Sequence, residues 1–160
     1  MSDSDHEFEK AQQSGSHTYP KAAGDCKKGD YILLNGHPAR IVETSTSKTG
    51  KHGHAKSKIC AIDIFTGAKV EDVLPSSHNV DCPFVTKTEY ELVSINEGDF
   101  ITFVDEEGNY REDLKLPKED DNSDFITPLK ADYEKGMNLV ITVTSAMGTE
   151  QVVGYRENKK

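Results

Sequence analysis

The sequence predicts an all-β protein built from two small barrels, and three observations indicate this class. Short runs of apolar and β-branched residues alternate with turns rich in Gly, Asn and Pro. Only 34% of the 160 residues are hydrophobic and Trp is absent, so neither half of the chain can bury a large core. Pro83 separates two sets of such runs and marks the expected domain boundary. These features favour two small β domains over one large α/β enzyme.

The amino-terminal segment, residues 1–17, is expected to be a disordered acidic tail. Between Ser2 and Ser16 the only large apolar side chain is Phe8. Such a segment cannot bury enough apolar surface to offset the entropy lost on ordering. Ser2 and Ser4 lie among acidic residues and are candidate phosphorylation sites for an acid-directed kinase, with an unmodified tail as the alternative.

The first barrel is expected in residues 18–83. Asn35-Gly36, Thr66-Gly67 and Pro75–Ser77 have the composition of tight turns. The strand-like runs around them are Asp30–Asn35, Pro38–Glu43, Ile59–Phe65 and Lys69–Leu74.

The second barrel is expected in residues 84–160, with a hairpin turn at Glu106–Asn109. One short helix fits here, with Thr127 as its N-cap, Pro128 as its first residue and Gly136 at its end. The strand-like runs are Phe84–Ile95, Asp99–Val104, Tyr110–Leu116, Asn138–Thr144 and Gln151–Tyr155. Five strands with a helix between the third and the fourth is the order of an OB fold.

Charge is distributed unevenly between these segments. The whole chain has a net charge of -9. Residues 84–160 carry nine Lys and Arg against seventeen Asp and Glu, a net charge of -8, whereas residues 18–83 have a net charge of +2. Overall acidity argues against general coating of nucleic acid, but a local basic patch can still bind phosphate.

The cysteines and the amino terminus indicate an intracellular protein. Cys26, Cys60 and Cys82 are odd in number and none are spaced C-x-x-C, so reduced thiols are expected. No apolar run approaches the roughly 20 residues that a membrane-spanning helix needs. The acidic start of the chain is unlike a signal peptide. We expect a cytoplasmic protein that can also enter the nucleus.

The segment Ser45–Lys58 is the most informative part of the chain. It contains four lysines and two histidines, and no acidic residue lies between Glu43 and Asp63. With no aliphatic side chain beyond Ala55 before Lys58, it cannot fold onto a core and is expected to project as a hairpin tip. Its basic residues are Lys48, Lys51, His52, His54, Lys56 and Lys58.

Lys51 lies near the centre of this segment, with Gly50 before it and Gly53 after His52. Glycines let the backbone turn tightly and leave the lysine stem unobstructed. A projecting positive side chain fits a narrow polyanionic crevice. The alternative interpretation is a mobile basic loop that contacts only solvent.

Three other kinds of site fit this segment poorly. A phosphate-binding loop needs Gly five residues before Gly-Lys and Ser or Thr after it, but His52 follows Lys51. A zinc site could recruit His52, His54 and Cys60, yet the neighbouring lysines would repel a dication. Nucleophilic catalysis by Cys60 or Cys82 needs a base and an orienting acid, and cysteines in strands are usually only buried. We therefore predict no metal ion and no catalytic residue.

Five short motifs of the chain carry a resemblance to a known family, namely Ser45–Lys56, Ile62–Gly67, Glu71-Asp72, Pro75–Asn79 and Arg111–Pro117. They resemble the eukaryotic translation initiation factor 5A family, whose bacterial relative is elongation factor P. The resemblance extends from about Tyr19 to Ala146. The chain departs from the family at Asp81–Phe84, where valine and asparagine are more usual around the proline, and at Gly148–Lys160.

The resemblance implies an SH3-like first barrel, an OB-fold second barrel and a modified Lys51. Deoxyhypusine synthase would transfer an aminobutyl group from spermidine to Lys51, and deoxyhypusine hydroxylase would convert the product to hypusine. No other cofactor is implied. The modification lengthens the side chain and adds a second amine, which carries more positive charge into an RNA crevice.

The resemblance further implies a translation factor that is not an enzyme. It would bind the E site of the large ribosomal subunit beside peptidyl-tRNA and ribosomal RNA, and relieve stalling at proline runs and during termination. The second barrel is too acidic to bind RNA strongly and would contact ribosomal protein, or RNA through few residues. A free single-stranded RNA-binding module is the alternative. The ribosome-binding loop comprises Lys48, Thr49, Gly50, Lys51, His52, Gly53, His54, Lys56 and Lys58.

Overall fold

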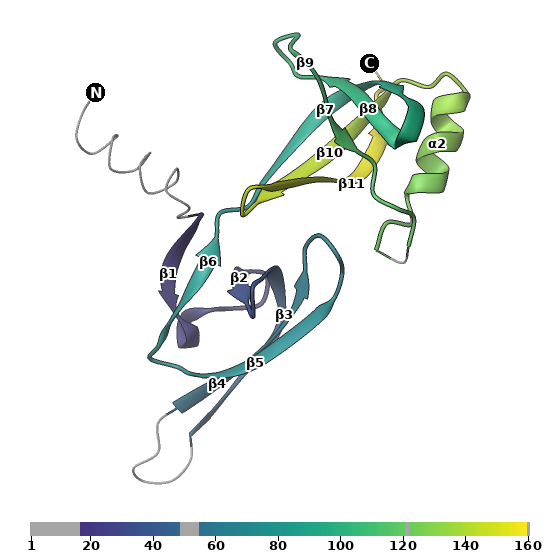
Figure 1. The fold of residues 1–160 in the computed structure, drawn as a ribbon. Helices are drawn as coiled ribbons and strands as arrows, with labels where there is room; N and C mark the ends of the chain where they lie inside the picture. Colours follow the sequence, from purple (N-terminus) through teal and green to yellow (C-terminus); the bar gives the residue numbers. More distant parts are fainter. Residues whose placement is uncertain (1–16, 49–54, 121, 160) are drawn as a thin grey trace, which may run out of the picture. The chain divides into compact units, whose positions relative to one another are not determined.

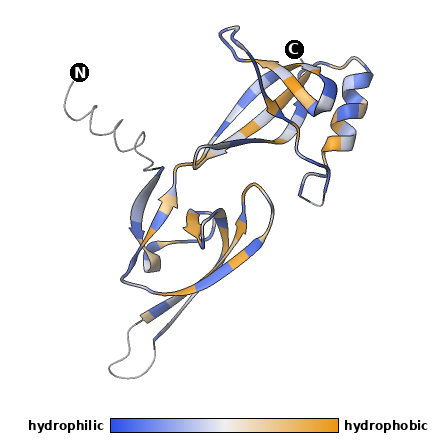
Figure 2. Ribbon diagram, in the orientation of Figure 1, coloured by the Kyte–Doolittle hydropathy of each residue, from blue (hydrophilic) through white to orange (hydrophobic). Residues whose placement is uncertain are grey.

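The computed structural model describes residues 17–48, 55–120 and 122–159, which form mainly β-strands (Figure 1). Hydrophilic and hydrophobic positions alternate along several strands, as expected for sheets with one buried face (Figure 2). Among the described residues α2 is the only α-helix, so the predicted all-β class with one short helix is confirmed. No described helix is long and apolar enough to cross a bilayer.

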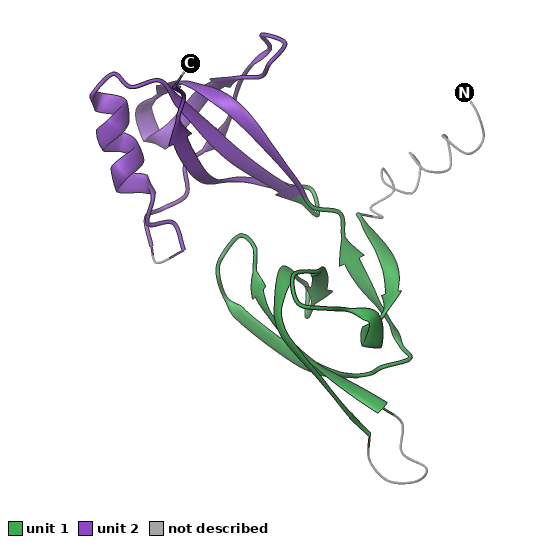
Figure 3. Ribbon diagram, turned by 180° about the vertical axis from the view of Figure 1, so that it is seen from behind, with its two compact units in different colours: residues 1–85, 146–148 green, residues 86–145, 149–160 purple. Residues whose placement is uncertain are grey.

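The chain divides into two compact units (Figure 3). Unit 1 comprises residues 1–85 and 146–148, and unit 2 comprises residues 86–145 and 149–160. The tail with Ser2 and Ser4 lies outside the described residues.

Unit 1 contains a four-stranded antiparallel sheet in the order β2-β3-β4-β5 and a two-stranded ribbon of β1 and β6. The large sheet curls into a half-barrel, which agrees with the SH3-like barrel that the resemblance implies. The buried side chains of unit 1 include Ile32, Ile41, Ile59 and Cys82. The strands are β1 (Thr18–Ala22), β2 (Tyr31–Leu34), β3 (His37–Lys48), β4 (Ala55–Asp63), β5 (Lys69–Pro75) and β6 (Asn79–Pro83).

Two features of unit 1 differ from the strands expected from the sequence. The β1–β6 ribbon was not expected, because neither strand shows a clear apolar alternation and their pairing joins residues far apart in the chain. Strands β3 and β4 are longer than the predicted runs. The extra residues of β3, Thr44–Lys48, are exposed and pair with β4 through backbone hydrogen bonds. Hydrophobic periodicity cannot detect a strand that is stabilised in this way.

Unit 2 has five strands in the order β11-β10-β7-β8-β9, with α2 between the third and fourth strands in sequence. This confirms the predicted OB fold. Ile126 and Leu129 of the helix are buried, and Phe103 and Ile141 lie in the same core. The elements are β7 (Thr86–Ile95), β8 (Phe100–Val104), β9 (Tyr110–Lys115), α2 (Ile126–Glu134), β10 (Leu139–Ala146) and β11 (Thr149–Glu157).

The start of α2 corrects the predicted helix cap, whereas its end is as expected. Helix α2 begins at Ile126, so Thr127 is inside the helix and is not the N-cap. The N–H of Thr127 donates instead to Glu119 Oε2 at 3.0 Å, so a carboxylate from the preceding loop replaces the local cap. Gly136 follows the helix with a φ of 78°, which confirms that it ends the helix.

Candidate functional site

Strands β3 and β4 form the two arms of a long hairpin. Their described ladder extends from Ala39 opposite Asp63 to Lys48 opposite Ala55. The arms of the predicted hairpin are therefore present. Its tip lies outside the described residues and contains Thr49, Gly50, Lys51, His52, Gly53 and His54.

The register shows which lysines share a face of the hairpin. Lys56 lies opposite Ser47 and Lys58 opposite Ser45, so these two lysines are on one face. Lys48 lies opposite Ala55 and belongs to the other face. All three lysines are exposed. The sequence predicted one basic segment, and the structure distributes its described lysines over both faces.

A buried polar contact holds the second arm of the hairpin near the tip, in addition to the ladder between β4 and β5. Ser57 is 3% exposed, and its Oγ lies 2.7 Å from Ser76 Oγ. The N–H of Ser76 donates to the carbonyl of Ala55 at 2.9 Å, directly beside the tip. The turn that follows β5 therefore positions the second arm of the hairpin.

A second set of contacts fixes this turn. The N–H groups of Ala23 and Gly24 donate to the carbonyls of His78 and Ser76 at 2.8 and 2.9 Å. A Cβ added to Gly24 would lie 3.1 Å from Ser76 Cβ, so only glycine fits comfortably there. Sequence analysis did not identify Ser57, Ser76 or Gly24. The available signal was that Ser57 occupies an inward position of the pattern that Ile59 and Ala61 continue.

The far end of the hairpin is stabilised by a buried carboxylate. Asp63 is 5% exposed, its Oδ2 lies 2.7 Å from His37 Nδ1, and its Oδ1 accepts the N–H groups of Phe65 and Thr66. Burial alone would raise the pKa of Asp63, but the hydrogen bonds from His37 and the two N–H groups lower it below its usual value. The ionised carboxylate thus joins the start of β3 to the turn after β4.

The cysteines considered as nucleophiles have environments that disfavour the thiolate. The thiol of Cys60 donates to Glu71 Oε2 at 3.4 Å, and its pKa is raised by burial and by this carboxylate. Burial raises the pKa of Cys82 to about 11. A protonated thiol is a poor nucleophile and a poor metal ligand. The structure therefore gives no support to catalysis by either cysteine.

The possible zinc site also gains no support. Two of its three proposed ligands, His52 and His54, lie outside the described residues. Within the described ranges, no group of three His, Cys, Asp or Glu side chains is arranged to hold a metal ion.

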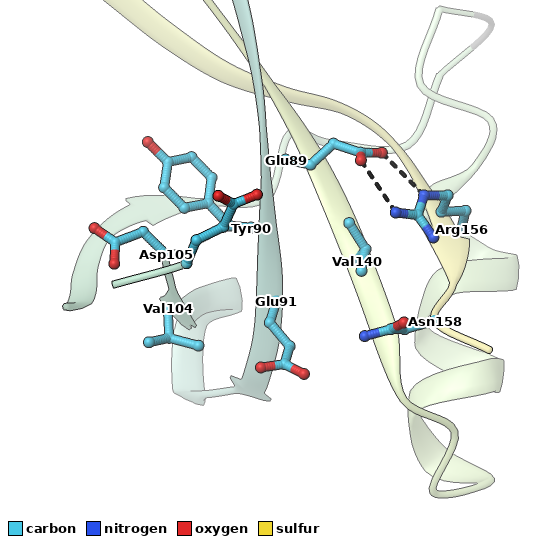
Figure 4. Close-up of a pocket in the computed structure, with 9 residues that line it drawn as sticks. Glu89, Tyr90, Glu91, Val104, Asp105, Val140, Arg156 and Asn158 are labelled. Carbon is cyan, nitrogen blue, oxygen red and sulfur yellow. Dashed lines mark hydrogen bonds and ion pairs between the residues drawn. The ribbon is translucent and has the colours of Figure 1, made fainter. Parts of the chain in front are cut away.

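Unit 2 has a hollow of about 500 Å³ over strands β7, β8, β10 and β11 (Figure 4). Arg156 carries the only basic side chain among its lining residues, and Glu89 already holds it through two hydrogen bonds of 3.0 and 3.1 Å. The remaining charge is negative and would oppose phosphate. The carboxylates that line the hollow are Glu89, Glu91, Asp105 and Glu106.

Two protein-family models together match most of the chain. One, described as translation initiation factor 5A-like, N-terminal, matches residues 16–78. The other, described as eukaryotic elongation factor 5A hypusine, DNA-binding OB fold, matches residues 84–156.

Two plant proteins named as eukaryotic translation initiation factors 5A are similar to this chain over nearly its whole length. Eukaryotic translation initiation factor 5A-4 of Solanum tuberosum is 49% identical over 158 residues, which cover 98% of each chain. Eukaryotic translation initiation factor 5A-3 of Arabidopsis thaliana is 46% identical over 157 residues, again 98% of each chain.

Two solved structures resemble the whole fold. A translation initiation factor eif-5a family protein from Naegleria fowleri has a TM-score of 0.82 and 46% identity, with 88% of this chain and 99% of the other covered. The eukaryotic translation initiation factor 5A from Methanococcus jannaschii has a TM-score of 0.66 and 26% identity, with 88% and 96% covered.

Proposed function

We propose, from the premise that this chain belongs to the eukaryotic translation initiation factor 5A family, that it is a translation factor acting on the ribosome through the tip of its β3–β4 hairpin. The observation that carries the proposal is the hairpin itself. Its arms hold the ends of the tip side by side at Lys48 and Ala55, and the buried Ser57–Ser76 contact fixes one arm to the barrel. A basic tip on a fixed support is suited to entering a crevice of RNA.

Lys51 is the residue that would enter this crevice. We infer that it receives an aminobutyl group from spermidine by the action of deoxyhypusine synthase and is then hydroxylated by deoxyhypusine hydroxylase. The added amine extends the reach of the positive charge. The family description that names hypusine supports this assignment.

The arms of the hairpin would hold the tip in place by contacts with phosphate. Lys56 and Lys58 lie on one face and Lys48 on the other, so RNA can be contacted on both sides of the tip. Such contacts give orientation and affinity without reading sequence. In the E site, beside peptidyl-tRNA, this arrangement would orient the tRNA end and favour peptide-bond formation at stalling sequences such as proline runs, and termination.

The chemistry in this proposal belongs to the ribosome, and the chain contributes binding and orientation. We therefore propose no enzymatic activity for the chain itself. Its site of action is the cytoplasm, with the nucleus as a second compartment. Unit 2 would contact ribosomal protein, or RNA through few residues, because the carboxylates around its hollow repel phosphate.

Mass spectrometry of the protein isolated from its native source tests the proposal. We expect a mass increase equal to hypusine formation, and peptide mapping should locate it on Lys51. Lys48, three residues earlier in the same basic segment, is the internal control and should be unmodified. If Lys51 is unmodified and the protein binds free single-stranded RNA as tightly as ribosomes, the alternative of an RNA-binding module is correct.

A further inference from the structure

Unit 2 has a second hollow of about 420 Å³ that adjoins the one already described. The two hollows have Glu89, Asp105 and Glu106 in common among their lining residues, so they form one continuous groove. We call it the unit 2 groove. It extends from Glu107, which lines only the second hollow, to Asn158, which lines only the first.

The floor of the unit 2 groove is apolar. The strand register places one row of side chains across β10, β7, β8 and β9, namely Val140, Glu91, Val104 and Tyr110. Residues that are paired across antiparallel strands project from the same face of a sheet. Val140 is only 7% exposed but is not part of the core cluster of unit 2, and Val104 is half-buried. The groove therefore offers apolar contacts in addition to charge.

The rim of the unit 2 groove carries unbalanced negative charge. Five carboxylates line the groove against two basic side chains. Arg156 is already held by Glu89 (Figure 4), and Asp105 accepts two N–H groups of its own turn at 2.9 Å. In the described part of the chain, the carboxylates of Glu91 and Glu106 have no ion pair or hydrogen bond. These two carboxylates are available to a positively charged partner.

Tyr110 adds an exposed aromatic ring to this surface. It is 66% exposed and lies opposite Val104 in the β8–β9 ladder. A guanidinium group binds a carboxylate through a fork of hydrogen bonds and stacks on an aromatic ring. A phosphate group can make neither interaction and is repelled by the rim. Since adjacent strands lie about 4.8 Å apart, the row from Val140 to Tyr110 matches about four residues of extended chain.

We propose that the unit 2 groove binds an extended, arginine-bearing segment of a partner protein. Its arginines would bind Glu91 and Glu106 and stack on Tyr110, and small apolar side chains between them would lie on the floor of the groove. The proposal deepens the contact of unit 2 described under the proposed function, because it selects protein over RNA as the partner. It rests on that function only for the ribosomal setting, since neither the hairpin nor Lys51 takes part in the contact.

Titration of the full chain with a short labelled peptide of alternating arginine and alanine tests the groove. Recombinant protein with unmodified Lys51 is used, so a failure here is separate from a failure of the modification and translation experiments. We expect saturable binding that shifts the backbone amide signals of Glu91, Val104 and Tyr110 in NMR spectra. The same peptide with citrulline in place of arginine is neutral and should not bind.

Two pairs of substitutions separate the groove from the general acidity of unit 2. Glu91→Gln with Glu106→Gln should weaken peptide binding about tenfold, because two unpaired carboxylates of the rim are neutralised. Glu97→Gln with Glu134→Gln removes the same charge from positions that do not line the groove, and should weaken binding less than about twofold. All four positions are exposed, so both variants should fold.

Other results would overturn the proposal. Equal weakening by the two pairs would mean that the peptide responds only to overall charge, and equal binding of the citrulline peptide would mean that no guanidinium is recognised. A single-stranded RNA that shifts the same amides would assign the groove to nucleic acid. Shifts of these amides that grow with protein concentration in the absence of peptide would assign it to a second copy of the chain.

Discussion

At the scale of single residues, Ser57 and Asp63 fix the two ends of the strand that leads away from the hairpin tip. Ser57 binds Ser76 beside the tip, and Asp63 binds His37 and the following turn at the far end of β4. Both side chains are buried although they are polar. A buried polar group costs free energy unless it is hydrogen-bonded, so these contacts determine the position of the strand.

Ser57→Ala should leave the Ser76 hydroxyl without this partner. We expect the free energy of local opening of the β3–β4 hairpin to fall by about 1–2 kcal/mol, because a polar group is left unsatisfied next to the core. Native-state hydrogen exchange of the β3–β4 amides measures this change. Ser45→Ala, an exposed substitution on the other arm, is the control and should change the same free energy by less than about 0.5 kcal/mol. Equal effects of the two substitutions would contradict the anchoring role of Ser57.

Asp63 should make unit 1 sensitive to acid. Its pKa is lowered in the folded state, so its stabilising contribution is complete above the unfolded pKa of about 4 and is lost as the pH falls through the lower folded value. Asp63→Asn removes the charge, so the variant should lose less stability than wild type over this acid range. Hydrogen exchange of the unit 1 amides, measured across the pH range, gives the slope of unfolding free energy against pH for wild type and for Asp63→Asn. Asp81→Asn, an exposed change on β6, is the control and should keep the wild-type slope. A wild-type slope in Asp63→Asn would disprove the stabilising role of the ionised Asp63 carboxylate.

At the scale of elements, Arg111 joins the two edge strands of unit 2. It lies on β9 and makes two hydrogen bonds of 3.1 and 2.7 Å to Glu150 on β11. Its guanidinium also lies 5.1 Å from the ring centroid of Phe103. Since β9 and β11 are at opposite ends of the sheet order, this ion pair helps to close the barrel.

Arg111→Lys should weaken that closure even though the charge is kept. Lysine cannot make the forked pair of hydrogen bonds or stack on Phe103, so we expect a loss of about 1–3 kcal/mol in the stability of unit 2. Exchange of the β9 and β11 amides in the full chain reports this loss. Arg156→Lys is the control, because its pair with Glu89 is also forked but more than half of the Arg156 side chain is exposed. That substitution should cost less than about 1 kcal/mol.

Element by element, the sequence predicted the structure best where apolar residues were concentrated in short runs. The run Ile59–Phe65 predicted the inner part of β4, where Ile59, Cys60 and Ala61 are all buried. The OB-fold order followed from five such runs and one helix. The β1–β6 ribbon, the outer arms of the hairpin and the Glu119 contact at α2 depend on residues distant in sequence, which local patterns do not encode.

The location of the candidate site could be predicted from the sequence, but the contacts that hold the hairpin arms in place could not. The density of lysines and the absence of acidic residues placed it between Glu43 and Asp63. The strand register places Lys48 on the opposite face of the hairpin from Lys56 and Lys58. The contact of Ser57 with Ser76 forms because β5 pairs with β4. Neither could be derived from composition.

At the scale of the whole molecule, positive charge is concentrated on the hairpin and negative charge on unit 2. Ribosome binding that depends on the hairpin should therefore weaken with salt, because each phosphate contact releases counterions. Lys56→Ala with Lys58→Ala should flatten the slope of log affinity against log salt by up to about two units, and Lys48→Ala by up to about one. Ribosome affinities measured at several salt concentrations give the slopes.

Lys69 provides the control for this measurement. It is exposed on β5 opposite Ile62, at the end of the sheet far from the tip. Lys69→Ala should keep the wild-type slope. Equal slopes for all variants would mean that the hairpin lysines contact only solvent.

The most direct measurement of the central claim is translation through a run of prolines with the Lys51→Arg protein, prepared alongside its modifying enzymes. Arginine keeps the positive charge but cannot accept the aminobutyl group. With Lys48→Arg as the matched control, we predict that Lys51→Arg folds normally yet fails to relieve stalling, whereas Lys48→Arg retains most of the wild-type rate. A Lys51→Arg protein that relieves stalling as fast as wild type would contradict the account.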